Sequence, residues 1–179
     1  MGLLLMSACG SVTRAPVGGG LQAGTVESPK GASLTPVREL TARQQEMSQV
    51  VSGWLAAEEA FADAVRTSDP YEPDLAATTL DPQLDGTRSF LERMSAHGLV
   101  AKGPVQYGAP HITELHGTKA MVRVCAMDAE IVVSSRTGRP VPGILGEVAF
   151  ELFTSTMQLT DGGWKLISQD VGVGRCNHL

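Results

Sequence analysis

Residues 37–70 read VRELTARQQEMSQVVSGWLAAEEAFADAVRTSDP, the first stretch of the chain with a sustained hydrophobic period. Apolar side chains recur there at steps of three and four residues, which is the period of an amphipathic helix. We therefore expect a long helix from about residue 39 to 67, with Thr41 as a cap for a slightly later start. Asp69-Pro70 ends it, because a residue before proline disfavours the helical conformation. The apolar positions are Met47, Val50, Val51, Trp54, Leu55, Ala57, Phe61 and Val65.

Two adjacent acids lie within this helix, at Glu58 and Glu59. Neighbouring residues of a helix project about 100° apart, so the two carboxylates cannot point into one site. We expect them to belong to a solvated face of the helix.

Shorter helices follow the long one. Prolines 73 and 82 limit any helix between residues 71 and 86 to one or two turns. The next segment, TRSFLERMSAHGLVAKG at 87–103, carries a helical apolar stripe. Gly98 suits the left-handed position that ends a helix, and His97 suits the last turn better than a metal site.

From Gly103 onward the period changes from helical to two, which is the period of a β-strand. The runs are 104–117, 118–135, 146–160 and 163–174, joined by turn sequences. Short connections make successive strands antiparallel neighbours, with one face packed, we expect, on the long helix. In the third run Val148, Phe150 and Leu152 share a face opposite Glu147, Ala149 and Glu151. The order predicts an α+β domain in which a long helix and shorter helices pack on a curved antiparallel sheet of about four strands.

This order of elements resembles the nuclear transport factor 2-like (NTF2-like) superfamily, which includes SnoaL-like and ketosteroid-isomerase-like proteins. The resemblance covers about residues 40–179. A sharper likeness is to secreted actinobacterial lipoproteins of this superfamily, through VCAMD at 124–128 and GGWKLISQDVGVGRC at 162–176. The resemblance implies a cone-like sheet that encloses a pocket, and a possible homodimer formed through the sheet.

The segment LLLMSACGS at residues 3–11 resembles the bacterial lipoprotein signal, in which an apolar residue and two small ones precede a cysteine. In that family the cysteine carries diacylglycerol and becomes the new N-terminus. Met6 stands where leucine is usual, and the basic region is missing, so residues 1–9 resemble a truncated signal that ends at a lipidated Cys9. The alternative is an unstructured start with a chance cysteine.

Residues 10–38 are rich in Gly, Ser, Thr and Pro and show no period. Such a composition is typical of a flexible tether. We expect residues 39–179 to form the folded domain, held by Cys9 at the extracytoplasmic face of the cell membrane.

Apart from Cys9, the chain has two cysteines, Cys125 and Cys176. In an exported protein an even pair favours a disulfide, here one that pins the last strand. A zinc site would need recognised ligand spacing, and a redox pair usually has a CxxC spacing; neither is present.

Composition excludes some functions. The formal net charge of −5 argues against binding to nucleic acid, whose phosphates attract Lys and Arg. No phosphate loop, GxSxG, HExxH or dinucleotide fingerprint occurs. We expect no cofactor and no bound metal.

A pocket in the cone would draw on polar side chains of the strand-rich half. We assign Tyr107, His111, Asp128 and Asp170 to it, and none of them a catalytic role. Asp128 is also placed to hydrogen-bond a neighbouring strand or loop. The wider set of candidates is Tyr107, His111, Glu114, His116, Asp128, Glu130, Glu151 and Asp170.

These observations favour a lipid-anchored, non-catalytic domain that binds a partner protein or a small apolar ligand. The alternative is a SnoaL-like isomerase or dehydratase that uses an acid or histidine in the pocket. An inward acid or histidine in a closed apolar pocket would favour the enzyme, and a filled core would favour an interaction module.

Overall fold

The computed structural model describes residues 39–141, 148–174 and 176. Cys9, the expected signal and the expected tether lie outside these residues. Residues 39–179 form one compact unit, and everything below concerns that unit alone.

Three helices open the fold. Helix α1 (Ala42–Thr67) begins at a capping box, in which Thr41 accepts from the backbone of Gln44 and the Gln44 side chain accepts from the backbone of Thr41. It ends at Ser68, which adopts the left-handed conformation one residue before Asp69. Helix α2 (Pro73–Thr78) is short, as the prolines predict, and helix α3 (Gln83–Ala96) ends at His97. The expected left-handed Gly98 is confirmed, with φ +63°.

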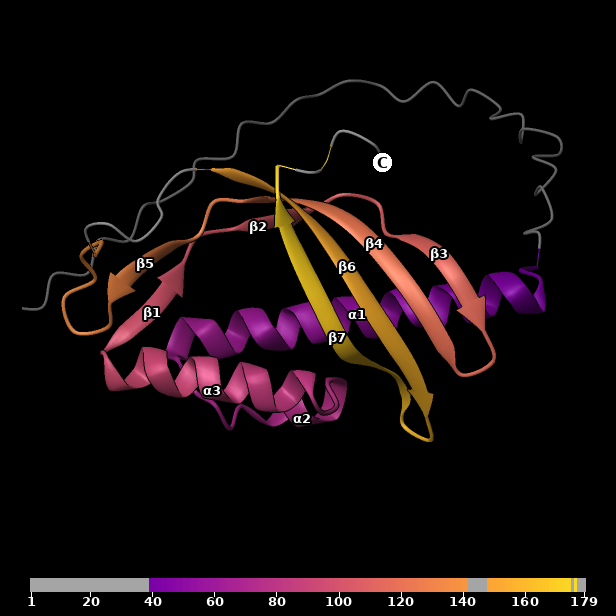
Figure 1. The fold of residues 1–179 in the computed structure, drawn as a ribbon, viewed down its shortest axis with the longest axis horizontal. Helices are drawn as coiled ribbons and strands as arrows, with labels where there is room; N and C mark the ends of the chain where they lie inside the picture. The colour runs from indigo at the N-terminus through magenta and orange to yellow at the C-terminus, as the bar shows by residue number, and fades with distance from the viewer. Residues whose placement is uncertain (1–38, 142–147, 175, 177–179) are drawn as a thin grey trace, which may run out of the picture. The chain divides into compact units, whose positions relative to one another are not determined.

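An antiparallel sheet follows, in the order β2-β4-β6-β7, with β3 also paired to β4 (Figure 1). The expected α+β class is therefore confirmed, and the sheet is four strands wide because β2 and β3 lie along the same edge of β4. Its strands are β2 (Val105–Tyr107), β3 (His111–His116), β4 (Lys119–Asp128), β6 (Ala149–Thr160) and β7 (Gly163–Val173).

Two of the four predicted strand runs are divided. The first breaks into β2 and β3 around Pro110, which cannot donate a hydrogen bond to a ladder. The second ends its pairing in the main sheet at Asp128. It continues as β5 (Ile131–Ser134), which pairs with β1 (Leu99–Lys102), a strand that the helical period of its surroundings concealed.

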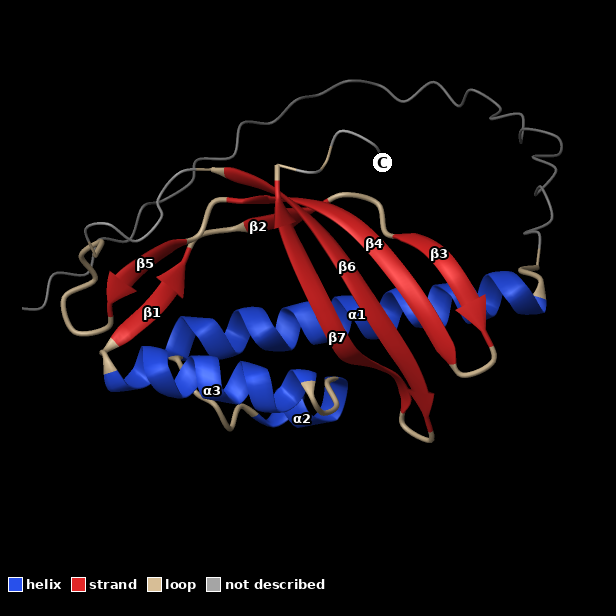
Figure 2. Cartoon of the chain, viewed as in Figure 1, coloured by secondary structure: helices blue, strands red, loops and turns tan. Residues whose placement is uncertain are grey.

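The helices gather on the concave side of the sheet, with α1 lying across it (Figure 2). Because side chains alternate along a strand, one face of β4 points at α1, and its residues Ala120, Val122, Val124 and Ala126 are buried. A main core between α1 and the sheet includes Trp54, and a second core joins the end of α1 to α2, α3 and β1.

The inner face of β6 is not the set that contains Val148, Phe150 and Leu152. Val124 pairs with Phe153 and Ala126 with Glu151, so Phe153 and Glu151 share the inner face. Phe150 is 58% exposed on the other face. The register to β4, rather than the hydrophobicity of β6 itself, decides which set points inward.

Cys125 and Cys176 form the predicted disulfide, with their Cα atoms 5.6 Å apart. Cys125 lies on the outer face of β4, and β6 lies between β4 and β7. The bridge therefore ties the segment after β7 to β4 across the outer side of β6. None of the helices in the described part of the chain is both long and apolar enough to cross a membrane.

Candidate functional site

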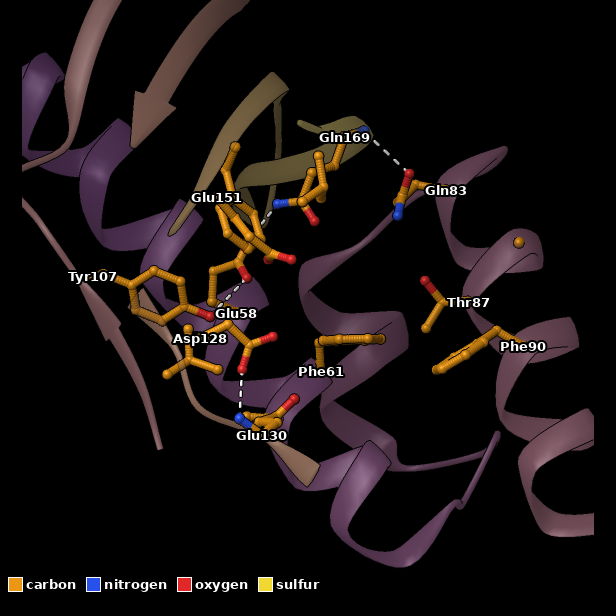
Figure 3. A pocket seen from close by; sticks show the side chains of 15 residues that line it. Glu58, Phe61, Gln83, Thr87, Phe90, Tyr107, Asp128, Glu130, Glu151 and Gln169 are labelled. Carbon is orange, nitrogen blue, oxygen red and sulfur yellow. Dashed lines mark hydrogen bonds between the residues drawn. The ribbon is translucent and has the colours of Figure 1, made fainter. Parts of the chain in front are cut away.

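A pocket of about 330 Å³ opens between α1, α3 and the inner face of the sheet (Figure 3). Its walls combine aromatic rings with carboxyl and amide groups, the composition of a small-molecule site. The lining residues are Glu58, Phe61, Ala62, Gln83, Gly86, Thr87, Phe90, Val105, Tyr107, Asp128, Glu130, Glu151, Phe153, Gln169 and Val171.

Glu58 lies deepest among the charged groups, with only 3% of its surface exposed. One carboxylate oxygen accepts from the Tyr107 hydroxyl at 3.0 Å, and the other accepts from the Gln169 side-chain amide. Burial raises the pKa of Glu58, while the hydrogen bonds from Gln169 and Tyr107 oppose that rise. The residue is therefore a buried carboxyl held by two neutral donors.

The expectation of a solvated Glu58-Glu59 pair is wrong for Glu58. It lies four residues after Trp54 and three before Phe61, so it shares the stripe of α1 that faces the sheet. The 100° step leaves Glu59 exposed, as expected.

A hydrogen-bonded chain holds the Glu58 partner Gln169 in place. The Gln169 amide also donates to the Ser155 hydroxyl at 3.1 Å, and the indole of Trp54 donates to the same hydroxyl at 3.0 Å. The backbone of Gln169 donates to the side chain of Gln83 at 3.1 Å, which links β7 to α3. Buried polar groups connected in this way favour a single side-chain geometry.

Tyr107 is fixed by aromatic contacts on two sides. Its ring lies edge-to-face with Trp54 at 5.1 Å and with Phe153 at 5.8 Å between centroids. Burial, and then the neighbouring charge of Glu58, raise the pKa of Tyr107, so its hydroxyl stays protonated and donates.

Three more carboxyl groups line the pocket. They belong to Asp128 at the end of β4, Glu130 in the loop after β4 and Glu151 in β6. Asp128 accepts a hydrogen bond from the backbone N–H of Glu130 at 2.7 Å. It therefore makes the loop hydrogen bond that the sequence offered as an alternative role, in addition to lining the pocket. Burial raises the pKa of both Glu130 and Glu151, and the charge of Asp128 adds to each rise. The Arg66 charge works in the opposite direction on Glu130.

The facing wall is apolar. Figure 3 shows Phe61 from α1 and Phe90 from α3 opposite the carboxyl groups, with Thr87 between them and Gln83. The two phenyl rings are tilted by 31°, with centroids 6.3 Å apart.

The structure brings two of the four assigned pocket residues together and leaves two outside. Tyr107 and Asp128 line the pocket. His111 lies on β3, exposed and beyond the break after β2, and does not line it. Asp170 pairs with Thr154 on the outer face of the sheet, because it alternates with the inward Gln169 and Val171.

Of the wider candidates, Glu130 and Glu151 line the pocket, whereas Glu114 and His116 are exposed on β3. Glu58 and Gln169 were missed by the sequence analysis. The spacing of Glu58 from Trp54 is a usable signal, but the inward direction of Gln169 depends on a register shift in β7 between Leu166 and Ser168, opposite Met157 and Thr156 of β6. Among the described residues, no three His, Cys, Asp or Glu side chains are placed to hold a metal ion.

No family model matches the chain, and no curated protein is similar to it in sequence. Several solved structures match part of the chain at low identity. One is a ketosteroid isomerase-like protein from Erwinia carotovora, at 14% identity and a TM-score of 0.49, covering 72% of this chain and 96% of that one. Another is the intermembrane space region of the chloroplast protein ARC6, at 17% identity and a TM-score of 0.49, covering 76% and 99%.

A third is a protein of the NTF2-like family from Streptomyces avermitilis, at 18% identity and a TM-score of 0.45, covering 70% of this chain and 95% of that one. At such identities and TM-scores these matches carry no argument about family or activity, so we take function from the pocket itself.

Proposed function

We propose that residues 39–179 form a non-catalytic domain that binds a small molecule, carried on a lipid anchor at the extracytoplasmic face of the cell membrane. One observation carries the binding function. A pocket of about 330 Å³ has a buried carboxyl, Glu58, fixed between Tyr107 and Gln169, and aromatic walls around it. Fixed polar groups set in a concavity with aromatic walls are typical of a ligand site, and they favour a small ligand over a partner protein.

The anchor is a separate part of the proposal, and it rests on the resemblance of residues 3–11 to a lipoprotein signal. The disulfide between Cys125 and Cys176 supports export, since such bonds persist in oxidising compartments. The ligand would then be met outside the cytoplasm.

Native mass spectrometry of the protein extracted in detergent from its source cells tests the binding function. Gly86 of α3 lines the pocket, and a Cβ built there meets nothing within 4 Å, so Gly86→Trp places an indole in the open space. We expect a small molecule on the wild type that is absent from Gly86→Trp. Ser89→Trp, at an exposed position of the same helix, is the matched control and keeps it.

A ligand retained by Gly86→Trp, or found on no variant, contradicts the binding function. The anchor is tested by Cys9→Ser in a chain with the full signal. We expect this variant to leave the membrane fraction, and unchanged retention contradicts the anchor.

A second candidate is an isomerase or dehydratase that uses Glu58 as an acid or base. The raised pKa of this inward carboxyl favours it, because a general acid must hold its proton near the working pH. The two candidates differ in what happens to the captured molecule. Incubation with fresh wild-type protein converts the molecule to a product if the chain is an enzyme and leaves it unchanged if the chain is a binding protein.

A further inference from the structure

The charged side chains that line the pocket are all negative. Four carboxyl groups line it, from α1 (Glu58), from β4 (Asp128), from the loop after β4 (Glu130) and from β6 (Glu151). No Lys, Arg or His of the described chain lines the same pocket. Arg66 reaches Glu130 electrostatically from α1, but its guanidinium pairs with Asp63 on the exposed side of that helix.

Glu58 receives only neutral donors. The Tyr107 hydroxyl and the Gln169 amide each serve one of its oxygens, and each carboxylate oxygen can accept a second hydrogen bond. A carboxylate buried to this extent is costly unless a positive charge or further donors complete its surroundings. The described residues supply no cation to it.

The wall of the pocket that faces these carboxyl groups is apolar. Phe61 and Phe90 lie opposite the carboxyl groups with their rings 6.3 Å apart (Figure 3), so they can contact an apolar body. Because the face of an aromatic ring attracts a cation, a positive group can also lie next to these two rings without a loss of binding energy.

We infer that the ligand is an organic cation: a protonated amine, joined to an aromatic or aliphatic body that packs on Phe61 and Phe90. This inference rests on the proposed binding function and names its ligand class. An anion would meet four carboxyl groups without a compensating base. A neutral ligand would displace water from Glu130 and Glu151 and leave these carboxylates without a positive partner.

Three probes of one shape test the charge preference: 2-phenylethylamine, 2-phenylethanol and 3-phenylpropanoate. Each joins a phenyl ring to a short chain, and at pH 7 they are cationic, neutral and anionic. Isothermal titration calorimetry on the full chain measures all three. We expect the amine to bind about tenfold or more tightly than the alcohol, the ratio given by one hydrogen bond to a charged group, and the anion not to bind.

Charge-removing variants locate the effect. Glu151→Gln and Glu130→Gln keep the side-chain shape at the pocket, and each weakens amine binding several-fold while leaving alcohol binding within about twofold. Asp170→Asn is the matched control, because it removes one negative charge from β7 on the outer face of the sheet. It leaves all three affinities unchanged.

The failures of the two proposals are distinguishable. If the alcohol or the anion binds as tightly as the amine and Gly86→Trp abolishes that binding, the pocket is a ligand site and the cation inference is overturned. If none of the probes binds, or if Gly86→Trp changes nothing, the inference falls together with the binding site. If Asp170→Asn weakens amine binding as much as Glu151→Gln does, the preference comes from overall charge and the inference is again overturned.

Discussion

Glu58 lines the pocket and, as a buried carboxyl group, lowers the stability of the fold at neutral pH. The folded protein raises the pKa of this carboxyl above its ordinary value of 4.5, chiefly through burial. As the pH rises above 4.5, the Glu58 carboxyl therefore keeps its proton in the folded state at pH values where the unfolded state has lost it. Stability from this group consequently falls as the pH rises from 4.5 through the folded pKa, and stays low above it.

Replacing Glu58 by Gln removes that loss. The amide oxygen of Gln still accepts from Tyr107, and its amide nitrogen donates to Gln169 once the Gln169 amide turns its oxygen toward position 58. We expect the free energy of unfolding of Glu58→Gln to exceed that of the wild type at neutral pH and to decline less between pH 4.5 and 7. Urea denaturation across this range measures it. Glu59→Gln, at the exposed neighbour, is the control and follows the wild type; a Glu58→Gln curve parallel to the wild type contradicts the account.

Removing the side chain altogether has the opposite effect. Glu58→Ala leaves the Tyr107 hydroxyl and the Gln169 amide without their acceptor, and a buried unsatisfied polar group costs about 1–3 kcal/mol. We expect the same denaturation experiment to show a loss of that size at pH 7. A variant as stable as Glu58→Gln would show that the two donors find other partners.

For single residues, the sequence predicts which polar residues could line a pocket better than it predicts the direction in which each side chain points. Asp128 and Tyr107 follow simple alternation along their strands, and both line the pocket. The pairing of Glu58 with Glu59 predicts the wrong side for Glu58, whereas its spacing from Trp54, one helical turn earlier, predicts the right one. The expectation of an inward Asp170 is wrong because nothing in its own strand reveals the register with β6.

At the scale of elements, the approach of α1 to β7 depends on Gly53. A Cβ at this position would lie 2.5 Å from the carbonyl oxygen of Trp164 and 2.8 Å from its Cβ. The helix is therefore closer to the strand here than any larger residue permits. This contact holds the main core, in which Trp54 and Trp164 are both buried.

We expect Gly53→Ala to lower the free energy of unfolding by about 1–3 kcal/mol, the usual cost of overpacking. Gly86→Ala in α3 is the matched comparison, because its Cβ meets nothing within 4 Å. That substitution raises stability by about 0.5–1 kcal/mol through helix propensity alone. Chemical denaturation of both variants checks the prediction, and effects of the same sign contradict it.

Element order and type were predictable because long periodic segments specify them. The capped helix α1 and the strand pair β6–β7 agree with their sequence patterns. The small β1–β5 sheet was not predictable, since four-residue strands have too few positions to show a period. The break between β2 and β3 follows from Pro110, but the fact that both halves keep to one edge of β4 is a tertiary property.

At the scale of the whole domain, the disulfide closes a loop of 51 residues that contains the end of β4 and all of β5, β6 and β7. On the loop-entropy relation such a closure stabilises by about 4 kcal/mol. We expect the double variant Cys125→Ser, Cys176→Ser to lose about that much in urea denaturation, and the reduced wild type to behave alike. A loss below about 1 kcal/mol would contradict a structural role for the bridge.

The bridge and the pocket lie on opposite faces of the sheet, so the two roles are separable. Cys125 points outward from β4, whereas its neighbour Ala126 points toward α1 and pairs with the pocket residue Glu151. The double cysteine variant, held at a temperature where it stays folded, should therefore bind the amine probe as the wild type does.

The most direct test of the central claim is an amide chemical-shift titration of the full chain with 2-phenylethylamine at pH 7. The account predicts saturable shifts around the pocket, at Gly86 on α3, at Glu151 on β6 and at Val171 on β7, with His111 and Glu114 on β3 unaffected. Shifts confined to the outer face of the sheet, or no saturable shift at the pocket, would contradict it.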